Sequence, residues 1–147
     1  MDFFKAMDIS TTGIIAQRYR LNVCIENLAN VHSTRTPKGG PYRRKQIVIG
    51  AAGGYEPFLN VLMGVGDPMH RLNGVRVVDV VEDPTPFKII HRPGHPDADK
   101  NGHVLMPNVN SMLEMADIVS ATRAYEANIV AFSAAKSMVA KALELAR

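Results

Sequence analysis

The stretch that decides the fold is residues 110–147, which read NSMLEMADIVSATRAYEANIVAFSAAKSMVAKALELAR. It contains no Gly or Pro and is dense in Ala, Leu, Met, Glu and Lys, the residues that lose least on entering a helix. Ser111 and Glu114 have the spacing of a capping box, and the cap-favouring Asn108 and Asn110 precede them. The stretch therefore predicts one continuous helix of about 36 residues, which is about 54 Å long at about 1.5 Å per residue.

Apolar residues recur along this helix at intervals of seven, as in the a and d positions of a coiled coil. One register comprises Ile118, Tyr125, Phe132 and Val139, and a second comprises Met115, Thr122, Ile129 and Leu143, with Lys136 as its one charged member. A compact globule of this chain length has a diameter of about 40 Å, which is less than the length of the helix. The apolar seam therefore needs another long helix, from the same chain or from a neighbouring molecule.

The composition suits one modest domain with a hydrophobic core, because 46% of the 147 residues are hydrophobic. The single cysteine, Cys24, excludes an internal disulfide framework and lies in a helical pattern, where we interpret it as a small apolar filler. No apolar run approaches the ~20 residues that span a bilayer. Asp2 and Asp8 interrupt any signal-peptide pattern, so we expect no cleavable signal and no membrane insertion.

A second helical pattern lies at the N-terminus. Its apolar positions recur at intervals of seven, at Met7, Ile14, Leu21 and Leu28, with Phe4 and Ile25 beside them. The run Ser10 to Gly13 interrupts it, because Gly costs about 1 kcal/mol in a helix and Thr is a poor helix former. We therefore expect a firm helix from Ile14 to Ala29 and frayed turns before it. Pairing of the two seams predicts a helical coiled-coil domain made of residues 1–34 and 108–147.

The residues between the two helices, 35–107, predict a small, mainly antiparallel β module. Val/Ile-rich runs bounded by Gly, Pro, Asp and Asn predict strands at Gln46 to Ile49, Val75 to Val81, Phe87 to His91 and His103 to Met106. The run from Tyr55 to Gly66 fits a short helix and a strand equally well. The fold class predicted is therefore α+β, with a β module inserted between two long terminal helices.

One segment of the β module matches the opening of a calcium loop. Its candidate ligands are Asp97, Asp99 and Asn101. Position twelve should be a Glu but is Asn108, and the same residues suit a polar turn between the strands ending at His91 and starting at His103. A zinc site with the histidines His91, His95 and His103 fits no closed four-ligand spacing. We favour the turn and keep a small calcium- or zinc-binding module as an alternative.

A basic run lies in a loop at residues 35–45, where Pro and Gly prevent regular structure. Its cations are Arg35, Lys38, Arg43, Arg44 and Lys45, and it contains no acid. Phosphate neutralisation by this run would suit a coiled-coil nucleic-acid binder, which is a further alternative. The net charge is only +3, however, so a solvated or subunit-contacting loop is favoured.

Four motifs in order resemble a known family. The motifs are Asn27-Leu28-Ala29-Asn30, then residues 35–44 (RTPKGGPYRR), residues 93–99 (PGHPDAD) with residues 106–110 (MPNVN), and Glu114-Met115 with residues 123–128 (RAYEAN). Together they resemble bacterial flagellar rod and hook proteins, and the two middle motifs are similar to the proximal-rod members of that axial family. The matched segments leave residues 51–74 uncovered.

The resemblance implies a structural subunit of the flagellar basal-body rod, without enzymatic activity or a cofactor. It implies partners in the same chain and other rod proteins, export through the flagellar export apparatus, and a place in the periplasmic rod, with no small-molecule or nucleic-acid partner. The helical assembly surface it implies comprises Met7, Ile14, Leu21, Ile25, Asn27, Leu28, Asn30, Met115, Ile118, Thr122, Tyr125, Ile129, Phe132, Val139 and Leu143.

Overall fold

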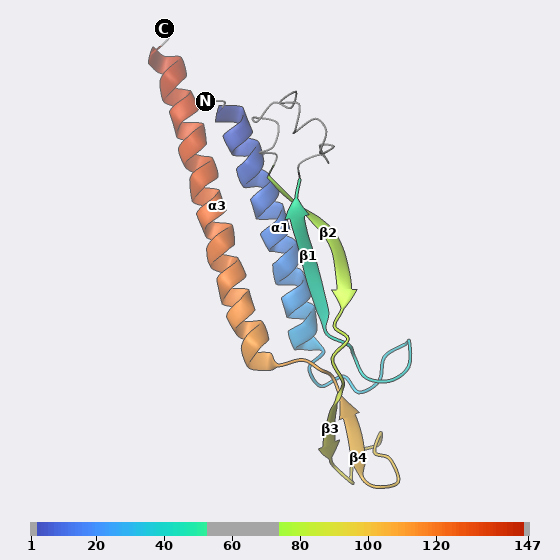
Figure 1. The fold of residues 1–147 in the computed structure, drawn as a ribbon. Coiled ribbons are helices and arrows are strands. Elements are labelled where there is room, and N and C mark those ends of the chain that lie inside the picture. Colours follow the sequence, from blue (N-terminus) through green and yellow to red (C-terminus); the bar gives the residue numbers. More distant parts are fainter. Residues whose placement is uncertain (1–2, 53–73, 146–147) are drawn as a thin grey trace, which may run out of the picture. The chain divides into compact units, whose positions relative to one another are not determined.

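The computed structural model describes residues 3–52 and 74–145 (Figure 1). In the sequence, one long helix precedes and another follows two small antiparallel two-stranded sheets, one formed by β1 and β2 and the other by β3 and β4. The elements in chain order are α1 (Phe3–Ala29), β1 (Lys45–Ala51), β2 (Val75–Glu82), β3 (Lys88–His91), β4 (His103–Met106) and α3 (Ser111–Leu145). This order confirms the predicted α+β fold class. The expected element at Tyr55 to Gly66 lies outside the described residues.

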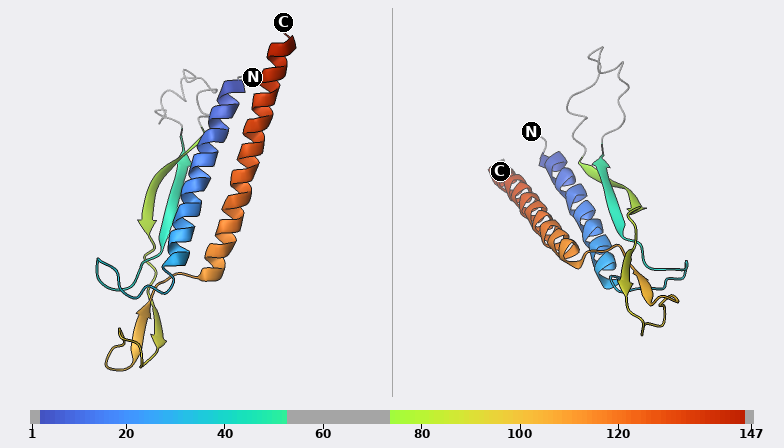
Figure 2. Two further views of the ribbon diagram at one scale, coloured as in Figure 1. Left: turned by 180° about the vertical axis from the view of Figure 1, so that it is seen from behind. Right: turned by 60° about the horizontal axis from the view of Figure 1, so that its bottom comes forward.

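The chain divides into two compact units, and each long helix contributes to both. The first unit comprises Met1–Tyr19, Ile49–Val78 and Thr122–Arg147, and the second comprises Arg20–Val48 and Asp79–Ala121. In the first unit the beginning of α1 runs beside the end of α3 in the opposite direction (Figures 1 and 2). In the second unit the end of α1 lies beside the beginning of α3, where side chains of the two helices bond directly.

Helix α1 begins at Phe3, so the expected start at Ile14 is wrong. The hydroxyls of Ser10 and Thr11 donate to the carbonyls four residues before them, and Thr12 donates to the Ile9 carbonyl. These bonds keep the hydroxyls within the helix, where they do not compete for a turn. Gly13 also has a packing reason, because a Cβ there would lie 2.9 Å from the Asn128 side-chain oxygen.

The two predicted registers of the α3 seam differ in how far the subunit buries them. Ile118, Tyr125, Phe132 and Val139 are all half-buried, in agreement with the first register. Of the second register, expected at Met115, Thr122, Ile129 and Leu143, only Thr122 is half-buried within the subunit, and the other three residues are exposed. The positions beside the first register are instead Glu114, Ala121, Asn128 and Ala135, of which only Asn128 is not fully buried. The seam is therefore lined by small and polar residues on one side, which no apolar pattern reveals.

The N-terminus of α3 is capped differently from the prediction. Asn110, not Ser111, is the capping residue, since its side-chain oxygen accepts the Met112 N–H at 3.1 Å. The Glu114 side chain does not reach back to complete a capping box. It points away from the helix end into the second unit.

The strands agree with the prediction to within one or two residues at each end. In the β3–β4 hairpin Ile89 pairs with Leu105 and His91 with His103. The Asp99 carboxylate accepts the N–H groups of Asn101 and His103 at 2.9 and 2.8 Å, and Gly102 supplies a φ of +75°. The segment is therefore the polar turn that the sequence favoured over a calcium loop.

Candidate functional site

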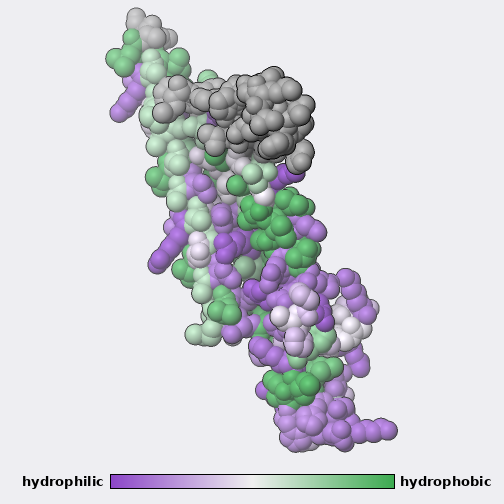
Figure 3. Space-filling view, in the orientation of Figure 1, coloured by the Kyte–Doolittle hydropathy of each residue, from purple (hydrophilic) through white to green (hydrophobic). Residues whose placement is uncertain are grey.

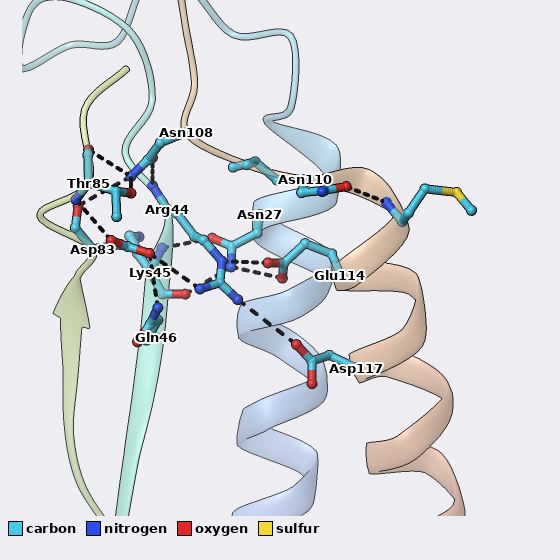
Figure 4. A network of polar contacts seen from close by, with 12 residues as sticks. Asn27, Arg44, Lys45, Gln46, Asp83, Thr85, Asn108, Asn110, Glu114 and Asp117 are labelled. Carbon is cyan, nitrogen blue, oxygen red and sulfur yellow. Dashed lines mark hydrogen bonds and ion pairs between the residues drawn. The ribbon is translucent and has the colours of Figure 1, made fainter. Parts of the chain in front are cut away.

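A group of buried and half-buried polar side chains in the second unit brings four distant segments together (Figure 4). We call it the polar cluster and define it as Asn27, Arg44, Asp83, Asn108 and Glu114. Asn27 lies on α1, Arg44 immediately before β1, Asp83 immediately after β2, and Glu114 on α3. Asn27, Arg44, Asn108 and Glu114 belong to the motifs on which the family resemblance was based.

Glu114 is the centre of the polar cluster and has no solvent-exposed surface. Its Oε1 atom accepts the Nε–H of Arg44 at 2.6 Å, and its Oε2 atom accepts the Asn27 amide at 3.1 Å. A buried carboxylate needs such partners, because an unpaired charge in the interior is strongly unfavourable. Burial would lower the Arg44 pKa, but the hydrogen bonds and charges of Glu114 and Asp83 together more than offset it, so the pKa lies above its ordinary value.

Asn27 uses both ends of its amide. Its nitrogen donates to Glu114 and to the Lys45 carbonyl, and its oxygen accepts the Lys45 N–H at 2.9 Å and the Tyr42 hydroxyl at 3.0 Å. Both backbone groups of Lys45 are thus bonded to one side chain of α1. The first residue of β1 is fixed against the helix by this arrangement.

Asp83 and Asn108 complete the cluster on the strand side. The Thr85 N–H, together with the Thr85 hydroxyl and Arg44, holds the Asp83 pKa below its ordinary value. Asp83 Oδ2 lies 3.3 Å from Arg44 and accepts the Gln46 amide at 3.0 Å. Asn108 accepts the Arg44 backbone N–H at 2.8 Å and donates to the Asp83 carbonyl. Arg44 is therefore held through both its main chain and its guanidinium.

The geometry of the polar cluster suits a structural role. Glu114 is sealed from solvent, and its charge is balanced by Arg44, so no substrate reaches it. The neighbouring Cys24 thiol is also buried; burial, and then the charge of Glu114, raises its pKa to about 11. A thiol with that pKa stays protonated at neutral pH and is a poor nucleophile.

The two carboxylates considered as calcium ligands already bind other groups of the protein. Asp97 accepts the Thr34 hydroxyl at 2.8 Å and pairs with Arg35 at 3.2 Å. Asp99 binds backbone N–H groups in the turn, and these lower its pKa below the ordinary value, the His103 N–H most. In residues 3–52 and 74–145 no group of three or more His, Cys, Asp or Glu side chains is placed to hold a metal ion.

The basic run is not the free cationic loop that a nucleic-acid surface needs. Arg44 is bound in the polar cluster, Lys45 pairs with Glu26, and Lys38 lies 3.4 Å from Glu82. The Arg43 guanidinium stacks 4.4 Å from the centre of the Phe87 ring. Most of these cations are therefore matched within the chain.

The residues predicted for assembly fall into two groups. Asn27 is in the polar cluster, and Asn30 ends α1 by bonding the Glu26 carbonyl and the Ser33 hydroxyl. The other predicted residues differ in burial. Four are exposed, namely Ile25, Met115, Ile129 and Leu143. The rest are half-buried, namely Met7, Ile14, Leu21, Leu28, Ile118, Thr122, Tyr125, Phe132 and Val139.

Large apolar side chains are exposed along both long helices, and sequence reasoning missed many of them. On α1 they are Phe4, Ile15, Tyr19 and Ile25, and on α3 they are Met112, Leu113, Met115, Val119, Ile129, Val130, Met138, Leu143 and Leu145. Figure 3 shows apolar residues along α3 on the visible face and further apolar groups over β2 and the β3–β4 hairpin. No helix in the described part of the chain is long and apolar enough to cross a membrane. An exposed apolar surface of this extent is typical of an interaction site.

Comparison with known proteins first identifies the class of protein to which the C-terminal region belongs. Residues 100–145, which include β4 and all of α3, match the family described as flagellar basal body rod FlgEFG protein C-terminal. The chain therefore has the C-terminal region of flagellar rod proteins.

Full-length relatives then define the family. The flagellar basal-body rod protein FlgC of Borreliella burgdorferi is 40% identical, with 99% of this chain and 98% of that protein covered. FlgC of Bacillus subtilis is 39% identical over 100% of both chains, and FlgC of Salmonella typhimurium is 40% identical over 99% and 98%. The chain belongs to the FlgC family of flagellar basal-body rod proteins. It is a structural subunit of the flagellar rod and serves flagellar motility.

Proposed function

We propose that the subunit joins the rod through the exposed apolar faces of α1 and α3. The observation that supports this proposal is the distribution of side chains on α3. Glu114, Ala121, Asn128 and Ala135 face the interior of the subunit, whereas large apolar residues such as Val119 and Val130 face outward. A soluble globular protein has the opposite arrangement, so these helices are built to be covered by neighbours.

The free energy available from such covering is large. Full burial of one Val, Leu or Met side chain contributes about 1.5–3 kcal/mol. Nine large apolar residues of α3 are exposed in the described part of the subunit. Covering even a few of them offsets several kcal/mol of the ordering cost of association. The role is structural and uses no catalysis.

The partners proposed are other copies of this chain and other rod proteins, with helices packed as a coiled-coil layer. Export through the flagellar export apparatus and a periplasmic place in the rod are part of the same proposal. They rest on membership of the FlgC family and on the resemblance of the terminal motifs to axial proteins. The domain boundaries proposed remain 1–34 and 108–147 for the assembly helices, with the β module between them.

The test is a change of Val130, whose side chain is 67% exposed. Val130→Asp places a charge on the outer face of α3, where the isolated subunit leaves it in water. We expect a melting temperature close to that of the wild type but no swimming in a strain that depends on the variant. Val130→Ile, which keeps the site apolar, is the matched control and should swim. Normal motility of Val130→Asp would contradict the proposal.

A further inference from the structure

The apolar half of the α3 seam does not by itself define one position for α3 along α1. Ile118, Tyr125, Phe132 and Val139 repeat every seven residues with similar apolar character. A slip of one repeat moves the helix by about 10 Å, at about 1.5 Å per residue, and places another apolar residue at each level. Some other feature has to select the register.

The polar contacts between the helices are spaced in a way that distinguishes one register from its neighbours. In the second unit Asn27 bonds Glu114, and Arg20 pairs with Asp117 at 2.7 Å. In the first unit Gly13 lies against Asn128. Asn27, Arg20 and Gly13 are seven residues apart in the sequence, so a contact of a different kind occurs at every second turn of α1.

We propose that Glu114 and Asp117, held by Asn27, Arg44 and Arg20, fix the register in which α3 lies against α1. A slip of seven residues in either direction separates Glu114 from Asn27 and leaves a buried amide and carboxylate without each other. Buried polar pairs of this kind contribute little net stability compared with apolar residues, but they select a register in coiled coils.

The register matters because it decides which apolar side chains of the two helices stand side by side on the outer surface. Arg44 also ties that register to β1, since its main-chain N–H is bonded to Asn108 while its side chain holds Glu114. Glu114 and Asp117 are therefore positioning residues for assembly. They position the two helices before assembly begins. Their effect on the register can therefore be measured in the free subunit, independently of the proposed assembly surface.

The experiment measures the distance between spin labels on the two helices of the full-length subunit. Labels are attached to cysteines at the exposed positions Asn22 and Met112, in a Cys24→Ala background. The test variant combines Glu114→Leu with Arg44→Met and Asp117→Leu with Arg20→Met, which replaces both partners of the two ion pairs with apolar residues. The control is Glu126→Gln, which removes an exposed acid from the same helix.

We expect one narrow distance distribution in the labelled background and in the control. In the test variant we expect a second distance population shifted by up to about 10 Å. A purely stabilising role would lower the melting temperature and leave a single distance in the folded fraction. A folded test variant with one unchanged distance would overturn the proposal.

Should the apolar variant fail to fold, Glu114→Gln with Asp117→Asn decides the question, because it removes both charges and keeps both shapes. A second distance population is expected there too. A single unchanged distance in this folded neutral variant would equally overturn the proposal.

Discussion

Arg44 Nε lies 2.6 Å from Glu114 Oε1, and Glu114 is completely buried. Seventy positions separate these residues in the sequence, and through Asn27 and Asp83 their ion pair links both long helices to the strands. The consequences are measurable in the isolated subunit.

Loss of one partner of this pair should be costly. Glu114→Ala leaves the Arg44 guanidinium without its main counter-charge, and we expect a loss of about 3–5 kcal/mol in the free energy of unfolding. The matched control is Glu82→Ala, which removes the exposed partner of Lys38 and should cost less than about 1 kcal/mol. Urea unfolding of both variants is the measurement. Equal losses in the free energy of unfolding would show that the buried ion pair contributes no more to stability than the exposed one.

Gly74 is expected to be much less replaceable than Gly39. Both have a positive φ, +82° and +86°, but a Cβ at Gly74 would lie 2.1 Å from Thr12 Oγ1, whereas the space around Gly39 is open. Gly74→Ala should destabilise by about 1–3 kcal/mol more than backbone strain alone, which Gly39→Ala reports. Thermal unfolding of the two variants tests this, and similar melting temperatures would contradict it.

Stability should fall in alkali. Burial is the main cause that raises the pKa of Cys24 to about 11 and of Tyr42 to about 12, from ordinary values of 9.0 and 10.0. Above pH 9 the unfolded chain loses protons that the folded chain keeps, so the free energy of unfolding decreases as pH rises. Urea unfolding at pH 8 to 11 measures the slope. Cys24→Ala and Tyr42→Phe together should reduce this slope. A wild-type free energy of unfolding that does not change up to pH 11 would contradict the burial of these two groups.

The sequence predicted the features that depend on local pattern. His103 to Met106 was placed without error, because Val104 and Met106 alternate with exposed neighbours between clear turn residues. The half-buried register from Ile118 to Val139 also followed from its period of seven. Fold class and family were reached from these patterns and the ordered motifs.

The polar cluster was not predictable in the same way. Glu114 fits a capping box locally, yet its side chain turns toward Arg44, and only the tertiary structure decides between the two. Helix α1 was expected to fray before Gly13, because Gly and Thr have low helix propensity. Propensity does not show that Gly13 is needed there, since Asn128 occupies the space that a larger side chain would take. In both cases a distant partner overrides a local preference.

Phe132 shows how the structure changes the choice of a test. The sequence placed it in the helical assembly surface, but it is half-buried within the subunit, so an aspartate there would disturb folding and assembly together. Two other residues of α3 separate these effects. Val119 is 52% exposed and Ala121 is 0% exposed.

The most direct test of the central claim compares Val119→Asp with Ala121→Asp, by melting the purified subunits and scoring swimming of strains that depend on each variant. If the outer face of α3 is the assembly surface, Val119→Asp melts like the wild type yet gives no swimming. Ala121→Asp, in contrast, should unfold the subunit, because it buries an unpaired charge. Normal swimming with Val119→Asp, or unfolding of that subunit, would contradict the account.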